Sequence, residues 1–244
     1  MTGSDSGSPN VARVYDCWLG GKDHYAADRE EAGRLLRIYP PLRAMVRENR
    51  AFLAQAVTWA AGQRIGQFTD LGAGLPTVQN THEVARAVNP AARVAYVDID
   101  PVVLSHARAL LATSDGVAAV AADLRDPAAV LADPQLRAVI DPAEPVCVIL
   151  AAVLHFLDAD AARQVTAGYA RLIAPGSCLA VSVVCYDDEA LGKRLAAEYT
   201  ASRTAFDARC RNEMPGSSSG AAVRTATCRN PARVSAIVRD RGVK

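Results

Sequence analysis

The chain has 244 residues, half of them hydrophobic, which is enough to build the core of one α/β domain. Its formal net charge of +1 excludes a strongly basic chain, so neither nucleic acid nor an anionic membrane is expected as a partner. The polar N-terminus and an apolar run limited to residues 146–154 predict no signal peptide and no membrane-spanning segment, and we expect a cytoplasmic protein.

The first quarter of the chain is predicted to be helical. Residues 1–9 are polar and form a flexible leader, and residues 10–62 form a helical extension. Helix-like patterns cover residues 11–19, 26–38 and 42–60, and glycine or proline pairs separate them. We therefore expect an all-helical extension before the first strand.

Residues 63–205 alternate between strand-like and helix-like segments with a period of roughly 25 residues, as a βα array does. The predicted strands cover residues 67–71, 93–98, 117–122, 146–152 and 177–185. Two of the helices between them start with Asp-Pro, a pair that suits a helix N-terminus. The pattern predicts an α/β fold with a Rossmann-like, doubly wound parallel sheet.

The last part of the chain does not continue this pattern. Residues 206–244 carry eight basic and three acidic side chains, and residues 214–244 contain no Leu, Phe, Tyr or Trp. We expect no core-forming strand there. Two explanations stay open: a disordered basic tail, or a reading-frame change near Met214, because such a composition is what a G+C-rich gene encodes out of frame.

The stretch from residue 67 to residue 101 predicts a nucleoside-binding βαβ unit. The first strand ends at Gly72-Ala73-Gly74, where two glycines permit a tight turn and a close approach of a ligand. A dinucleotide fingerprint would have a third glycine where this chain has Thr77. Asp70, just before the turn, would repel a phosphate but suits a cation. The motif favours S-adenosylmethionine over NAD.

Acidic and small residues at the ends of the following strands complete the predicted cofactor site. Asp98 should accept hydrogen bonds from both ribose hydroxyls, whereas Asp100 is predicted to be a helix N-cap. Asp123 and the backbone N–H of Leu124 are placed to meet an adenine ring. The residues predicted to bind the cofactor are Asp70, Gly72, Ala73, Gly74, Asp98, Ile99, Asp123, Leu124 and Ala151.

His155 follows the fourth strand on the same edge of the sheet. It is the candidate general base or substrate-orienting residue, and a histidine merely packed at a helix start is an equally good interpretation. His82 and Glu83 are expected to orient local structure. Lys22 or Tyr15 of the helical extension could reach the methionine carboxylate or the substrate, although an exposed charged turn is the default interpretation.

The cysteines predict no metal site, because they show no CxxC pair and no metal-ligand spacing. Three of them lie in strand-like runs, where a buried and inert thiol is expected. The six are Cys17, Cys147, Cys178, Cys185, Cys210 and Cys228.

Several motifs together resemble an actinobacterial family of candidate S-adenosylmethionine-dependent methyltransferases. They are VARVYDCWLGGKDHYAADR (11–29), NRAFL (49–53), DLGAGLPT (70–77), HEVA (82–85), VAYVDIDPVVLSHARALL (94–111), ADLRDP (122–127) and AVLHFL (152–157). The resemblance covers residues 11 to 213 and implies a class I methyltransferase fold and cofactor binding. The chain departs from the family pattern at Cys17-Trp18 and after Glu213.

These observations predict an enzyme that transfers a methyl group from S-adenosylmethionine to a small-molecule acceptor. One alternative is a module that binds the cofactor without turnover, because the unusual C-terminus would remove strands that build the sheet edge. The other is an NAD-dependent reductase, which would need the third glycine and a proton relay.

Overall fold

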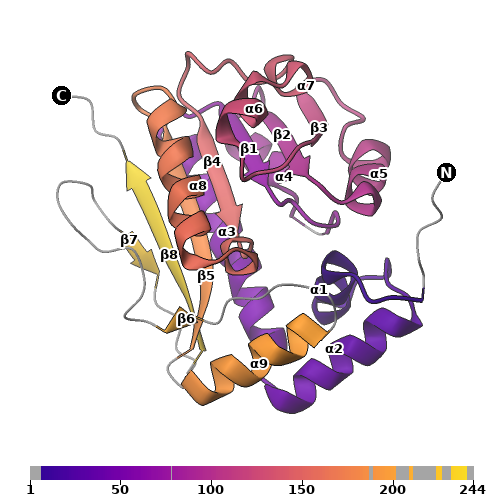
Figure 1. The fold of residues 1–244 in the computed structure, drawn as a ribbon. Coiled ribbons are helices and arrows are strands. Elements are labelled where there is room, and N and C mark those ends of the chain that lie inside the picture. The colour runs from indigo at the N-terminus through magenta and orange to yellow at the C-terminus, as the bar shows by residue number, and fades with distance from the viewer. Residues whose placement is uncertain are drawn as a thin grey trace.

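From residue 11 to residue 201, the predicted helices and strands occur in the predicted order, with a few short elements added (Figure 1). The computed structural model describes residues 7–77, 79–186, 189–201, 209–210, 224–226 and 232–240. The helices are α1 (Val11–Leu19), α2 (Ala26–Ile38), α3 (Leu42–Gly62), α4 (Thr81–Val88), α5 (Pro101–Leu110), α6 (Pro127–Ala132), α7 (Pro134–Arg137), η1 (Leu154–Phe156, a 3₁₀ turn), α8 (Ala159–Leu172) and α9 (Glu189–Ala201). The strands are β1 (Gln67–Leu71), β2 (Arg93–Asp98), β3 (Val117–Ala121), β4 (Cys147–Ala151), β5 (Cys178–Tyr186), β6 (Arg209–Cys210), β7 (Arg224–Ala226) and β8 (Ala232–Asp240).

Five parallel strands, β1 to β5, lie side by side in a single mixed sheet and extend to its β3 edge. The strand order is β3-β2-β1-β4-β5-β8-β7, and β6 pairs with β5. The chain moves from β1 to β2 and β3 on one side and then crosses to β4 on the other side of β1. Open α/β sheets bind ligands beyond the carboxyl ends of their strands at such a switch point. The predicted doubly wound parallel sheet is confirmed.

Alternate residues of each strand face opposite sides of the sheet, and helices cover both sides. Val94 and Tyr96 of β2 pack in a cluster with α3, α4 and α5. Ala95 and Val97, their neighbours, pack in a second cluster with α6, α7 and α8. Both faces of the sheet are therefore buried, which is why its strands are almost continuously apolar.

The predicted N-terminal helices form a layer of their own around α1, α2 and α3, which α9 joins (Figure 1). Val14, Trp18, Leu35 and Leu195 belong to its core and are buried. This layer therefore contains the first and the last helices of the described residues, α1 and α9. Helices α1, α2 and α9 lie below the carboxyl edge of the sheet in Figure 1, whereas α3 also extends along the sheet.

An ion pair inside this layer joins α1 to α2. Nε of Arg13 lies 2.7 Å from Oδ2 of Asp28, and the two side chains are 4% and 0% exposed. Asp28 also accepts hydrogen bonds from the backbone N–H groups of Asn10 and Tyr25, at 2.8 and 2.7 Å. The carboxylate is thus fully surrounded by donors, as a buried charge must be.

The glycine pair after α1 has a packing reason. Asp16 is buried and its Oδ2 accepts a hydrogen bond from the Asp23 backbone N–H at 3.0 Å. A Cβ on Gly21 would lie 1.8 Å from Oδ1 of Asp16, so only glycine fits beside this carboxylate. The VARVYD and GGKD segments therefore fix the path between α1 and α2 together.

Two strands, β7 and β8, follow residue 214, where no core-forming strand was expected. β8 pairs antiparallel with β5 from Cys178↔Asp240 to Tyr186↔Ala232, and β7 pairs antiparallel with β8. A backbone ladder on the open edge of β5 does not need large apolar side chains, and the β8 sequence is rich in β-branched residues that favour strands. Residues 224–226 and 232–240 therefore belong to the sheet, and both explanations of the unusual composition stay predictions.

Smaller differences concern element boundaries. The predicted helix after the glycine turn starts at Thr81, and Val78 lies outside the described residues. Most of the predicted leader, residues 1–6, also lies outside them. The short helix α7 was not predicted. None of the helices in the described part of the chain is both long and apolar enough to cross a membrane.

Candidate active site

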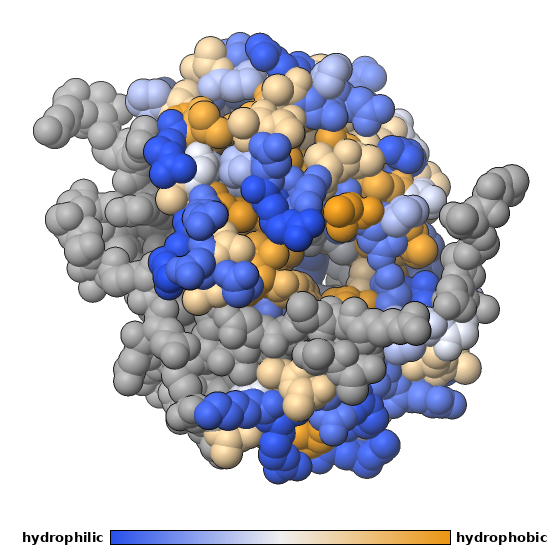
Figure 2. Space-filling view, in the orientation of Figure 1, coloured by the Kyte–Doolittle hydropathy of each residue, from blue (hydrophilic) through white to orange (hydrophobic). Residues whose placement is uncertain are grey.

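A cavity of about 420 Å³ lies at the carboxyl edge of the sheet, between the strands and helices α1 and α3. In Figure 2 this face of the molecule is hollowed, and hydrophobic residues border the opening. All ten predicted site residues line it: Asp70, Gly72, Ala73, Gly74, Asp98, Ile99, Asp123, Leu124, Ala151 and His155. The topology thus brings together residues that the sequence could place only at separate strand ends.

The two glycines of the turn after β1 have different roles. Both have a φ of +66°, in the left-handed region that favours glycine. A Cβ on Gly72 would lie 2.5 Å from Cγ2 of Val153, whereas a Cβ on Gly74 would meet no atom within 4 Å. Gly72 permits close packing between two strand ends, and Gly74 leaves open space inside the cavity.

Asp98 is held rigidly at the tip of β2. Its Oδ2 accepts a hydrogen bond from the Gly74 N–H at 3.1 Å, and its Oδ1 accepts one from the Asp100 N–H at 2.9 Å. Burial raises the pKa of this carboxyl group, and these backbone donors oppose the shift. A carboxylate has about four acceptor sites, so Asp98 can also accept a ribose hydroxyl. Asp100 caps α5 by accepting from the Val102 N–H at 2.8 Å, as predicted.

Asp70 is a buried acid at the end of β1. Its side chain is 5% exposed and accepts a hydrogen bond of 2.6 Å from the Thr81 hydroxyl. Burial raises its pKa from 3.8 to about 6; the Thr81 hydrogen bond and the charge of Arg50 act in the opposite direction. A cation beside Asp70 would relieve this desolvation cost.

Asp123 lies beyond the end of β3, where it forms an ion pair with Arg125. Nε of Arg125 lies 2.8 Å from Oδ2 and 3.0 Å from Oδ1 of Asp123. The guanidinium hydrogen bonds lower the pKa of Asp123. The contact between Asp123 and an adenine amino group stays a prediction. The ion pair with Arg125 was not predicted.

The end of β4 has an unusual backbone. Ala152 has a φ of +53°, which is uncommon for a residue with a Cβ. Its N–H donates to the hydroxyl oxygen of Ser182 at 2.9 Å, so β5 holds this conformation. His155, in η1, is 5% exposed and its ring lies 4.3 Å from that of Phe156. His155 therefore lies at the cavity wall as predicted, and its chemical role stays a prediction.

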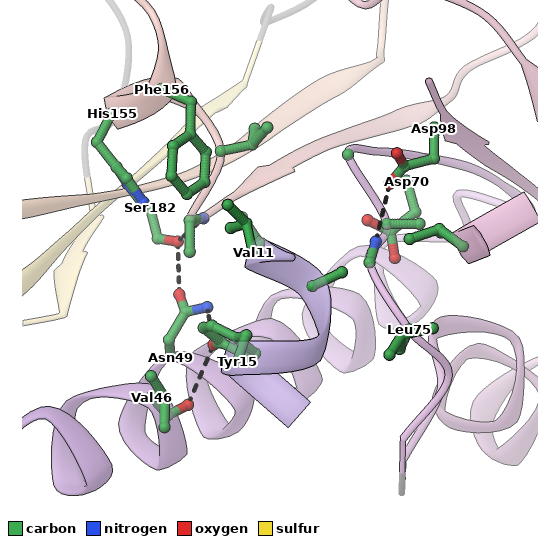
Figure 3. Close-up of a pocket in the computed structure, with 18 of the residues that line it drawn as sticks. Val11, Tyr15, Val46, Asn49, Asp70, Leu75, Asp98, His155, Phe156 and Ser182 are labelled. Carbon is green, nitrogen blue, oxygen red and sulfur yellow. Dashed lines mark hydrogen bonds between the residues drawn. The ribbon is translucent and has the colours of Figure 1, made fainter. Parts of the chain in front are cut away.

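A chain of polar side chains, which the sequence analysis missed, crosses the cavity wall opposite Asp70 and Asp98 (Figure 3). The Ser182 hydroxyl donates to Oδ1 of Asn49 at 2.5 Å, and Nδ2 of Asn49 donates to the Tyr15 hydroxyl at 3.0 Å. The Tyr15 hydroxyl donates to the Val46 carbonyl at 3.4 Å. The signal that could have revealed Asn49 is its position in the apolar stripe of α3, within the NRAFL motif.

The rest of this end of the cavity is mostly apolar. Its walls come from α1, α3, η1 and β5, and Figure 3 shows Val11 between the acidic end and the Asn49 end. The apolar side chains there are Val11, Trp18, Leu19, Leu42, Met45, Val46, Leu53, Phe156, Leu157, Val183 and Val184.

Of the other residues considered in the sequence, some line the cavity and some do not. Lys22 is exposed and does not line the cavity, so it shows only the default role of a charged turn. Tyr15 does line it. Nδ1 of His82 lies 2.8 Å from the Tyr96 hydroxyl, and Glu83 accepts from the Asn80 N–H at 2.8 Å, so both orient local structure as predicted. Within the described residues no cluster of His, Cys, Asp or Glu could hold a metal ion.

The observed groups fit S-adenosylmethionine. A glycine turn with open space, a hydrogen-bonded carboxylate at the tip of β2 and a buried acid at the end of β1 all lie in one cavity. No diphosphate-binding glycine follows the turn. The fold and site define a class I methyltransferase that uses S-adenosylmethionine.

The comparisons with known proteins give the family. A family model described as "S-adenosyl methyltransferase" matches residues 2–220, so the chain belongs to this family. The comparison with curated proteins found no match.

Two solved structures are similar to this chain over nearly its whole length. A candidate methyltransferase from Thermobifida fusca YX is 38% identical, with a TM-score of 0.85, over 98% of this chain and 97% of that chain. A DUF574 family protein from Streptomyces avermitilis is 33% identical, with a TM-score of 0.87, over 97% and 99%. The mitomycin 7-O-methyltransferase MmcR, 20% identical with a TM-score of 0.52 over 84% and 59%, shares the fold.

Proposed function

We propose that this protein transfers the methyl group of S-adenosylmethionine to an uncharged small molecule. The observation that carries the proposal is that one cavity has two chemically different ends. Asp70, Gly74 and Asp98 form an acidic end with open backbone, and the apolar residues around Tyr15 and Asn49 form the other. The first end suits a cationic nucleoside, and the second suits an acceptor with little charge, because an unpaired ion would be costly there.

The size of the cavity favours a small acceptor over a macromolecule. Helices α1 and α3 form walls of a space of about 420 Å³, which is in the range for small-molecule sites. The chain carries a net charge of +1, so nothing in its overall charge favours nucleic acid.

The chemistry that the cofactor supplies is a methyl group on a positively charged sulfur, which an acceptor atom displaces in line. The chain's own part is to align the reactants and to exclude water. Ala151 and Ala152 leave space at the end of β4, and α1 and α3 shield that space from solvent. Charge is lost from sulfur during transfer, so an apolar acceptor end does not oppose the reaction.

His155 is the candidate base for an acceptor that must lose a proton. Its position in the cavity wall next to Phe156 fits a group that receives a proton from a hydroxyl. An acceptor that is already deprotonated would need no base. His155→Gln should then lower kcat about 100-fold for a neutral hydroxyl acceptor only, with His82→Gln, outside the cavity, as the control.

The first test is calorimetric titration with S-adenosylhomocysteine, with NAD as the control ligand. We expect binding of the former alone, lost in Asp98→Ala and kept in Asp115→Ala, which changes an exposed acid outside the cavity. Labelled-methyl transfer to a panel of neutral phenols and alcohols, with matched carboxylates and amines, tests the acceptor. Preference for the charged compounds contradicts an uncharged acceptor, and binding with no transfer at all supports a module without turnover.

A further inference from the structure

Arg50 of α3 places a positive charge in the wall of the cavity, close to the glycine turn. Among the described residues that line the cavity, the lysine and arginine side chains are Arg50 and Arg125. Arg125 lies at the β3 end, where Asp123 binds its guanidinium at 2.8 Å. Arg50 is therefore the guanidinium on the Asp70 side of the cavity.

A backbone contact fixes the place of the Arg50 guanidinium. Its Nη2 donates to the carbonyl oxygen of Gln79 at 3.1 Å. Gln79 lies between the glycine turn and α4 and has a φ of +59°. A guanidinium carries five N–H donors in a planar fork, so it can bind this carbonyl and a carboxylate at the same time.

Arg50 and Asp70 together present opposite charges to one region. The positive charge of Arg50 acts on Asp70 and opposes the effect of burial on that acid. Both residues line the cavity together with Gly72 and Gly74. An α-amino acid group has an ammonium and a carboxylate on one carbon, so it needs an acidic and a basic partner close together.

We propose that the Arg50 guanidinium binds the α-carboxylate of the methionyl group of S-adenosylmethionine, opposite Asp70, which faces its ammonium. This inference rests on the proposed function, because it requires the chain to bind this cofactor. It gives Arg50 the role considered for Lys22 or Tyr15: Lys22 is exposed and outside the cavity, and Tyr15 donates its hydroxyl to Val46. The N-terminal layer then supplies a specificity-determining contact to the cofactor.

The experiment compares two ligands that differ only in this carboxylate: S-adenosylmethionine and decarboxylated S-adenosylmethionine. Binding of both is measured by calorimetry to the full chain and to Arg50→Met, with Arg47→Met as the control. Arg47 lies on the same helix and is exposed. We expect Arg50→Met to weaken binding of S-adenosylmethionine about 10- to 100-fold and to leave the decarboxylated ligand unchanged.

A second variant covers the case in which Arg50→Met does not fold. Arg50→Lys keeps the charge without the fork, so it should lose part of the affinity for S-adenosylmethionine and none for the decarboxylated ligand. Equal losses for both ligands, or no loss, overturn the inference and leave Arg50 a support for the Gln79 loop. Failure of the unaltered chain to bind either ligand overturns cofactor binding itself, and is thus distinguishable.

Discussion

The Ser182 hydroxyl donates a 2.5 Å hydrogen bond to Oδ1 of Asn49, a residue 133 positions earlier in the chain. This contact joins the end of β5 to α3, and through Tyr15 it reaches α1. Ser182 also accepts from the N–H of Ala152, so the same chain of bonds supports the left-handed residue after β4. The N-terminal layer and the sheet are thus joined by one buried polar network at the cavity.

The network predicts that Asn49 and Ser182 are energetically coupled. Asn49→Ala should lower the free energy of unfolding by about 1–3 kcal/mol, because it leaves the Ser182 and Tyr15 hydroxyls without this partner. In a double-mutant cycle with Ser182→Ala, the loss in the double variant should be smaller than the sum of the two single losses by about 1 kcal/mol. Thr58→Ala, an exposed hydroxyl on the same helix, is the control. Strict additivity, measured by urea denaturation, argues against the network.

The two glycines of the turn should respond differently to alanine. Gly72→Ala places a methyl group against Val153 and should lower the free energy of unfolding by about 2 kcal/mol or more. Gly74→Ala meets no atom within 4 Å, so it should cost only about 1 kcal/mol for its positive φ, yet lower cofactor affinity by filling the cavity. Thermal unfolding and calorimetry separate the two effects.

A compensating change tests the Gly72 assignment. Val153→Ala removes the atom that lies 2.5 Å from the new Cβ, so the double variant Gly72→Ala/Val153→Ala should recover part of the stability. Gly74→Ala/Val153→Ala should show no such recovery. If both pairs behave alike, the contact with Val153 does not set the requirement for glycine.

Asp70 predicts a pH dependence of stability. Its pKa of about 6 in the folded chain exceeds the value of 3.8 of an unperturbed aspartic acid, so the folded state favours the protonated form. The stability that protonated Asp70 gives to the folded state is complete below about pH 4 and is lost as the pH rises through 6. Asp70→Asn removes the buried charge, so it should raise the free energy of unfolding at pH 7 by about 1–3 kcal/mol and flatten this slope. Denaturation curves from pH 4 to pH 8 measure it.

Asp70 also predicts a pH dependence of ligand binding. Stability favours its protonated form, whereas binding of a cation favours its ionised form. A cationic ligand favours ionised Asp70, so affinity for S-adenosylmethionine should fall as the pH drops below about 6, and binding near pH 6 should release protons. Calorimetry in buffers of different ionisation enthalpy detects these protons. Methylthioadenosine, which lacks the amino acid group and the sulfonium charge, is the control. Proton release that persists in Asp70→Asn would mean that another group titrates.

The ion pair between Arg13 and Asp28 predicts an asymmetric response. Arg13→Met leaves Asp28 buried without its cation and should cost about 3–5 kcal/mol of stability. Replacing both residues, as in Arg13→Met/Asp28→Asn, should cost less than Arg13→Met alone, because no buried charge is then uncompensated and the amide oxygen can still accept a backbone hydrogen bond. Urea denaturation of both variants decides this. A larger loss in the double variant would show that the pair itself supplies net stability.

Much of the fold follows from local patterns in the sequence. The strands around the glycine turn and the first two helices have the predicted bounds, because hydrophobic periodicity and Gly or Pro breaks act over a few residues. The Asp-Pro pairs at 100 and 126 cap helices as expected, since an N-cap needs only its own turn. β8 was missed because residues 214–244 contain no Leu, Phe, Tyr or Trp, and the β5 edge with which β8 pairs lies far away in the sequence.

For the site, the sequence by itself determined the residues at strand ends. A parallel sheet places all its carboxyl ends on one edge, so Asp70, Gly74, Asp98 and Ala151 had to lie near one another. Only the tertiary structure decided which distant side chains meet there: Ser182 contacts Asn49, and Arg50 lines the same cavity as Asp70. Such contacts depend on how α1 and α3 pack against the sheet, and no short sequence pattern carries that information.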